Sequence, residues 1–125
     1  MEVIFSFEKL DVWQESRALV KDIYAIIRKF PSEERYALSD QIKRAVISIP
    51  SNIAEGSGRV SIKEKIHFTE IAYGSLMETF CQIQIARDLN YINDSILETI
   101  KIKIYLIAKM LSGMRNDLRN RLPKQ

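Results

Sequence analysis

The sequence has few of the residues that build disulfides, metal centres and tight turns. Among its 125 residues there is one cysteine, Cys81, and one histidine, His67. A single cysteine excludes an intrachain disulfide and an all-cysteine metal site, and a single histidine excludes a multi-histidine site. We therefore expect neither a metal nor a cofactor. The sequence also lacks the Asn-Gly and Asp-Gly pairs that are typical of β-hairpins.

Long hydrophobic runs and an N-terminal targeting segment are missing as well. The longest apolar runs have five residues, at Ile23 to Ile27 and at Ile104 to Ala108, whereas a membrane span needs about twenty. The segment before Trp13 contains Glu2 and Glu8 but no basic cluster, unlike a secretory signal. These absences predict no membrane association and a cytoplasmic location, where an unpaired thiol is stable.

What the sequence does contain is helical periodicity. Hydrophobic residues make up 46% and charged residues 28% of the chain, as in ordinary soluble proteins. Apolar residues recur at three- and four-residue steps in four long segments, a spacing that places them on one side of a helix. We predict a single all-α domain, residues 1–125, folded as an antiparallel up-down four-helix bundle. The predicted helices cover about residues 12–30, 33–56, 61–89 and 94–119.

Local sequence features suggest where these helices begin and end. Asp11, Ser32 and Ser61 are expected to cap the first three helices, because their side chains can accept hydrogen bonds from free amides. Gly56 and Asn90 are expected to end the second and third helices in the left-handed conformation. Pro50 falls inside the second helix and should kink it, because proline lacks the amide for one helical hydrogen bond.

The third and fourth predicted helices have more apolar surface than one bundle core needs. The additional residues are Ile66, Tyr73, Met77 and Phe80 in the third helix, and Ile102, Tyr105, Leu106 and Met110 in the fourth. This excess favours self-association; alternatively, these are the exposed apolar residues that most surfaces carry. Gly74 lies mid-helix, which costs about 1 kcal/mol relative to alanine. Because close packing would offset this cost, Gly74 predicts that another helix approaches closely at this position.

No arrangement of reactive residues predicts catalysis. The sequence lacks a Ser/His/Asp order, a phosphate-cradling loop of known spacing and a carboxylate-histidine metal repeat. His67 is expected at the surface, and Cys81 is expected to pack as a small buried hydrophobe. We therefore expect that the protein is not an enzyme. An active site that the motifs do not reveal would require Asn52, Glu55 and His67 to lie close together in space.

The segment from Ser48 to Arg59, SIPSNIAEGSGR, is the least ordinary part of the sequence. Its small polar residues share one helical face, and two interpretations remain open. In the first, the polar side chains form hydrogen bonds with backbone groups that Pro50 leaves without a partner. In the second, they bind a partner or ligand, which Asn52 and Glu55 contact directly. The candidate residues of the segment are Ser48, Pro50, Ser51, Asn52, Glu55, Gly56, Gly58 and Arg59.

Positive charge is concentrated near the C-terminus. Residues 1–91 contain 12 basic and 13 acidic residues, whereas residues 92–125 contain 7 and 3. An oligomer would repeat this cluster in each subunit and form a basic surface suited to nucleic-acid phosphates. We see no interleaved aromatic residues of the kind that bind single strands. The candidate contacts are Lys101, Lys109, Arg115, Arg119 and Arg121, with Arg44 and Arg59 as weaker candidates.

Several stretches of the chain match a known family. FEKLDVW at Phe7 to Trp13, the Ser48 to Arg59 segment and Ala86 to Ile92 resemble the four-helix bundle proteins encoded in intervening sequences of bacterial 23S ribosomal RNA genes. The resemblance implies a bundle that assembles into a ring of five subunits, in a family whose members are often described as uncharacterised. A related protein, the accessory variability determinant of diversity-generating retroelements, binds its reverse transcriptase and nucleic acid.

Together these observations lead to two hypotheses about function. The first is a non-enzymatic, ring-forming homo-oligomer that binds RNA, DNA or a ribonucleoprotein partner through a basic surface. The alternative is a structural or adaptor protein that docks a protein partner through Ser48 to Arg59 and has no nucleic-acid role.

Overall fold

The computed structural model describes residues 1–124, and every regular element within them is helical. Because no strand interrupts these helices, the prediction of an all-helical bundle is confirmed. The elements are the 3₁₀ helices η1 (Ser6–Lys9) and η2 (Ser32–Glu34) and the α-helices α1 (Asp11–Ile27), α2 (Leu38–Ser57), α3 (Ile62–Asp88) and α4 (Asp94–Asn120).

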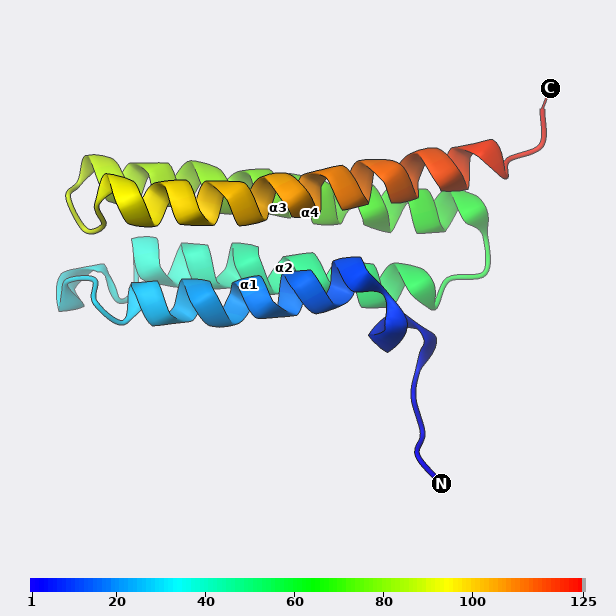
Figure 1. Ribbon diagram of the computed structural model, residues 1–125, viewed down its shortest axis with the longest axis horizontal. Helices are drawn as coiled ribbons and strands as arrows, with labels where there is room; N and C mark the ends of the chain where they lie inside the picture. Colours follow the sequence, from blue (N-terminus) through cyan, green and yellow to red (C-terminus); the bar gives the residue numbers. More distant parts are fainter. Residues whose placement is uncertain (125) are drawn as a thin grey trace.

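The four α-helices form two layers. In Figure 1, α1 and α2 make up one layer, α3 and α4 make up the other, and each helix runs back along the preceding one. The most extensive packing between helices is that of α2 against α3, which joins the two layers. The residues before η1 project from the end of the α1–α2 layer, away from α3 and α4.

The core lies between the layers and receives side chains from all four helices. Burying each isoleucine or leucine contributes about 1.5–3 kcal/mol, so the predicted apolar stripes hold the bundle together. The largest fully buried side chains are Leu19, Ile23, Ile42, Ile49, Leu76, Ile83, Ile107 and Leu111. None of the helices described in residues 1–124 combines the length and the apolar character needed to cross a membrane.

The predicted capping of the first helix is wrong. Asp11 is already helical, and Leu10 occupies the N-cap position without a side-chain hydrogen bond. Gln14 donates its side-chain amide to the Glu8 carbonyl at 2.8 Å, which ties α1 to the preceding η1. At the other end, α1 stops at Ile27 and Phe30 lies beyond it.

The second helix begins five residues later than predicted. Ser32 starts the short 3₁₀ helix η2 and makes no capping hydrogen bond. Glu34 takes that role, because its carboxylate accepts a hydrogen bond from the Leu38 amide at 3.2 Å. The Tyr91 hydroxyl, which follows α3, donates to the same carboxylate at 3.0 Å. The Glu34 carboxylate therefore meets both the first residue of α2 and a residue 57 positions further along the chain.

Gly56 does not end α2 in a left-handed conformation, since the helix continues to Ser57 and Gly58 is right-handed, with φ −86°. Gly56 is buried, and a Cβ atom at this position would lie 2.8 Å from the Cβ of Phe68 on α3. Glycine is thus needed for the close approach of α2 and α3. The helix is continuous through Pro50, and the kink there stays a prediction.

The boundaries of α3 and α4 match the predictions closely. The Ser61 hydroxyl accepts a hydrogen bond from the Glu64 amide at 3.0 Å, and the Asn93 side chain accepts one from the Ile96 amide at 2.8 Å. Asn90 follows α3 with φ 65°, the left-handed conformation expected there. In these two helices, local sequence determines the ends.

Candidate nucleic-acid interface

The first half of the Ser48 to Arg59 segment directs its polar groups into the protein. The Ser48 hydroxyl lies 2.8 Å from the Ser75 hydroxyl on α3. The Asn52 amide donates to the carbonyl and to the hydroxyl of Ser48, at 2.7 and 2.8 Å. Pro50 deprives the Val46 carbonyl of its helical donor, but Asn52 does not reach that carbonyl. These side chains instead connect α2 to α3.

The second half of the segment is also occupied by local contacts. Glu55 pairs with Arg59 at 3.3 Å, and the Arg59 guanidinium lies 4.7 Å from the centre of the Phe68 ring. The Ser57 hydroxyl donates to the Ala54 carbonyl one turn back, at 2.8 Å. Ser51 and Gly58 are exposed. Few groups of the segment are therefore free to meet a ligand.

The structure does not assemble the residues that an enzyme would need. His67 is exposed, and within residues 1–124 no hydrogen bond or ion pair joins it to Asn52 or Glu55. The same residues contain no group of three histidine, cysteine or acidic side chains that could hold a metal ion. Cys81 is exposed and not buried as predicted, because it lies on the opposite side of α3 from the buried Ile83.

The seven basic candidates divide into two groups. Arg119 on α4 pairs with Glu70 on α3 at 3.2 Å, and the arginines at 44, 59 and 121 pair with acids four residues earlier. Such exposed pairs add little stability, but each offsets a positive charge. Lys101, Lys109 and Arg115 have no carboxylate within ion-pair distance among residues 1–124. These three are the cations left available to an anionic ligand.

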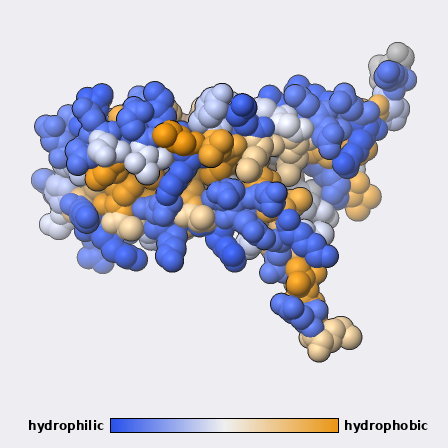
Figure 2. Space-filling model, in the orientation of Figure 1, coloured by the Kyte–Doolittle hydropathy of each residue, from blue (hydrophilic) through white to orange (hydrophobic). Residues whose placement is uncertain are grey.

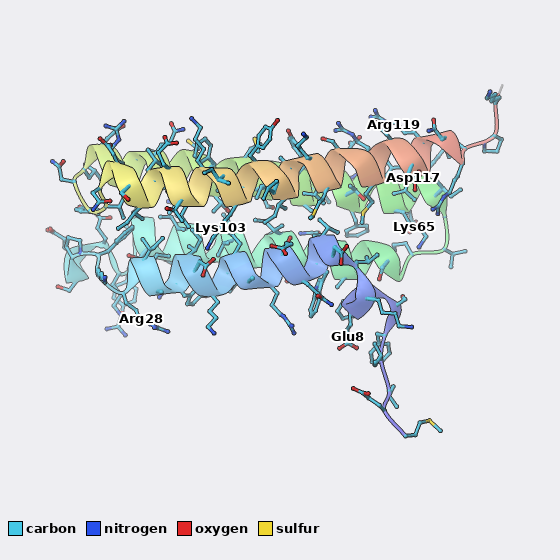
Figure 3. The ribbon with its side chains drawn as sticks, viewed as in Figure 1. Glu8, Arg28, Lys65, Lys103, Asp117 and Arg119 are labelled. Carbon is cyan, nitrogen blue, oxygen red and sulfur yellow. The ribbon has the colours of Figure 1, made fainter. Side chains whose placement is uncertain are left out.

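Residues 101–116 of α4 form a stretch that contains no acidic residue. Lys103 on this stretch turns toward α1 and pairs with Asp22 at 2.6 Å (Figure 3). Lys101, Tyr105 and Lys109 are spaced four residues apart, so they lie along one face of the helix. That face borders α3.

A groove between α3 and α4, which we term the α3–α4 groove, brings these residues together with aromatic side chains. The Lys109 ammonium lies 5.3 Å from the centre of the Tyr105 ring, and the Arg115 guanidinium lies 5.7 Å from the centre of the Tyr73 ring. The lining residues are Tyr73, Met77, Phe80, Lys101, Ile104, Tyr105, Ala108, Lys109, Ser112, Gly113 and Asn116. This corrects the expectation that basic and aromatic residues do not alternate.

Beside the groove, the outer sides of α3 and α4 are apolar. Residues 71–86 of α3 include a single charged residue, Glu78, and Figure 2 shows hydrophobic surface along the middle of α4. Gly74 is exposed, and nothing lies within 4 Å of where its Cβ would be. The predicted close approach is thus absent within the subunit. The exposed large hydrophobic residues outside the groove are Ile71, Ile85, Leu89, Ile102, Leu106 and Met110.

The comparison with known families identifies the chain. Residues 8–113 match the family model described as 23S rRNA-intervening sequence protein. The chain belongs to this family. The match includes the Ser48 to Arg59 segment and most of α4, so the resemblance seen in the sequence is confirmed.

One crystal structure similar to this family member is a protein of unknown function from the S23 ribosomal protein family of Bacteroides thetaiotaomicron VPI-5482. The two share 25% sequence identity and a TM-score of 0.77, over 83% of this chain and 97% of the other. No protein with a curated description matches this chain. Neither the family description nor this structure names an enzymatic activity.

Proposed function

We propose that this member of the 23S rRNA-intervening sequence protein family is a self-associating, non-enzymatic bundle that binds nucleic acid or a ribonucleoprotein partner through a basic surface. The observation that carries the proposal is a group of three cations without a carboxylate partner among residues 1–124, Lys101, Lys109 and Arg115, on an acid-free stretch of α4. Phosphates attract such cations and release condensed counterions when they bind. Repetition of the group in each subunit of a ring would multiply this effect.

The apolar outer sides of α3 and α4 support self-association. Ile102 is 60% and Leu106 is 52% exposed in the isolated subunit, although apolar surface of this kind is uncommon on monomers. A second copy that covers it would also place a helix near Gly74, where there is space for a close approach. We propose a homo-oligomer, with the ring of five implied by the family resemblance as its expected form.

Nucleic-acid binding is tested by fluorescence anisotropy with a labelled RNA at increasing salt. About six to ten phosphate contacts per ring predict a loss of affinity on the order of a thousandfold between 50 and 200 mM salt. The double variant Lys101→Ala, Lys109→Ala should weaken binding and reduce the salt dependence. The matched control Arg44→Ala, Arg121→Ala removes two cations that are already paired. No binding at low salt, or affinity independent of salt, would exclude this function.

Self-association is tested by analytical ultracentrifugation at micromolar concentration. The wild type should sediment as a multimer, and Ile102→Asp should dissociate it, because a buried carboxylate is strongly disfavoured. Val60→Asp is the control, since Val60 is 98% exposed in the α2–α3 connection. Cys81 lies on the outer side of α3, so thiol reagents should modify it more slowly in the multimer. A monomeric wild type would disprove the proposal.

The alternative, an adaptor that docks a protein through Ser48 to Arg59, is favoured by one observation. Pro50 and Ser51 line a shallow groove between α1 and α2, together with Trp13 and Arg17. A pull-down with and without nuclease separates the two functions. Partners that are retained after nuclease treatment support protein docking, whereas partners that are lost support binding through nucleic acid.

A further inference from the structure

We propose that the α3–α4 groove binds single-stranded nucleic acid, with a base stacked on Tyr105 and phosphates held by Lys101 and Lys109. This inference rests on the proposed function and specifies its substrate class and its site. It is carried by the alternation of cation, aromatic ring and cation along one face of α4, next to the aromatic residues of α3.

The spacing of these side chains suits a strand that runs along α4. Lys101 and Lys109 are eight residues apart, which corresponds to about 12 Å along a helix that rises 1.5 Å per residue. A nucleic-acid strand carries one phosphate about every 3.4 Å of duplex axis, and the spacing widens when the strand is extended. The two ammonium groups can therefore contact phosphates that are not adjacent. Tyr105 lies midway between them, where an intervening base would lie.

The exposed tyrosine favours a single strand over a duplex. The Tyr105 side chain is 59% exposed, and Tyr73, Met77 and Phe80 provide an apolar wall on the α3 side of the groove. A duplex stacks its bases internally and presents mainly phosphates to a helical surface, so an aromatic ring would add little to its binding. An unpaired base presents its face, and stacking it on an aromatic side chain contributes about 1–3 kcal/mol.

The electrostatics of the groove suit the same ligand. No acidic residue lines it, so no carboxylate repels a phosphate chain. Arg115, on the same side of α4, has a buried Nε without a hydrogen-bond partner, and its guanidinium lies beside Tyr73. Together with Lys101 and Lys109 it makes this side of α4 positive along the acid-free stretch.

The inference is tested with labelled oligonucleotides of about 15 nucleotides, within the length range that single-strand-binding proteins cover. The probes are oligo-uridine, a duplex of equal length and an abasic strand that keeps the phosphates. The wild type should bind oligo-uridine more tightly than either of the others. Tyr105→Leu keeps an apolar side chain without an aromatic face, and should weaken oligo-uridine binding about 5- to 150-fold. Its binding of the abasic strand should not change.

Two further variants separate stacking from structural effects. Tyr105→Phe should bind oligo-uridine as tightly as the wild type does, because phenylalanine keeps the aromatic face. Tyr36→Leu should have no effect, although Tyr36 is 84% exposed and lies beside Arg35 at 5.3 Å, because it lies outside the groove. Tyr105→Leu and Tyr105→Phe should both sediment as the wild type does, so a loss of binding in Tyr105→Leu reflects lost stacking and not a lost assembly.

The outcomes distinguish this inference from the proposed function. If Tyr105→Leu binds oligo-uridine as the wild type does, or the duplex binds as tightly as the single strand, the inference is wrong while nucleic-acid binding stands. If no oligonucleotide binds, both fail. Binding of poly-glutamate without binding of any oligonucleotide would identify the groove as a site for an acidic protein and overturn both.

Discussion

The Ser48 to Arg59 segment and the α3–α4 groove differ in how they use their polar side chains. In the segment, Ser48 and Asn52 form hydrogen bonds within the subunit, and Arg59 is held by Glu55. In the groove, Lys101 and Lys109 have no carboxylate partner among residues 1–124. The polar side chains of the most distinctive part of the sequence are therefore largely engaged within the subunit, whereas these two lysines of α4 are not. The rarity of a sequence segment does not by itself mark a binding site.

The largest effect on stability is expected at Gly56 within the segment. Gly56→Val should lower the free energy of unfolding by about 2–3 kcal/mol, because the new side chain would overlap Phe68 and force α2 and α3 apart. Chemical denaturation monitored by circular dichroism measures the change. A variant as stable as the wild type would show that Gly56 is not required for the close approach of α2 and α3.

Gly74→Val is the matched substitution on the outer side of α3. Nothing lies within 4 Å of this Cβ position in the subunit, so the subunit's unfolding free energy should change by less than about 0.5 kcal/mol. If the proposed oligomer forms, the same variant should weaken its assembly, as seen by sedimentation. A large loss of stability in the dissociated subunit would contradict the comparison with Gly56.

A smaller effect is expected from the polar connection between α2 and α3. Asn52→Ala removes two hydrogen bonds to Ser48 and should cost about 1–2 kcal/mol of unfolding free energy. Ser51→Ala changes an exposed neighbour and should be nearly neutral. If Asn52→Ala instead reduced the capture of a protein partner at unchanged stability, the segment would be a docking site.

The last prediction concerns the pH dependence of stability, through Tyr91. Partial burial, followed by the hydrogen bond to Glu34 and its negative charge, raises the pKa of Tyr91 above its ordinary value of 10.0. The neutral phenol is thus favoured in the folded chain, and this stabilisation is present below pH 10 and lost as the pH rises above it. Tyr91→Phe should remove that alkaline loss and, because it deletes the hydrogen bond to Glu34, should slightly destabilise the folded chain at neutral pH. Denaturation curves at pH 8 and above pH 10 measure both.

Most of the fold could be predicted because periodicity and capping are local. Both ends of α3 and the start of α4 follow from Ser61, Asn90 and Asn93. The start of α2 was harder to predict, because Glu34, which accepts from Leu38, also meets Tyr91, 57 residues further along the chain. The role of Gly56 was missed for a similar reason, since it depends on Phe68 across the α2–α3 contact.

The candidate site was predicted only in part. Pairs four residues apart, such as Asp40 with Arg44, can be read from the sequence, but the pairing of Arg119 with Glu70 requires the packing of α3 against α4. The four-residue spacing of Lys101, Tyr105 and Lys109 is present in the sequence, but their alternation was missed. Its significance emerged only once α3 supplied the opposite wall of the groove.

The hydrogen bond between Tyr91 and Glu34 has a consequence for the alignment of the two halves of the chain. It joins the connection between α1 and α2 to the connection between α3 and α4, at one end of the bundle. Sliding one helical hairpin along the other by a single turn, about 5.4 Å, would break this bond. Tyr91 thereby disfavours alignments of the two hairpins that are shifted by one helical turn. The apolar stripes alone would allow such shifts, because similar side chains recur along each helix.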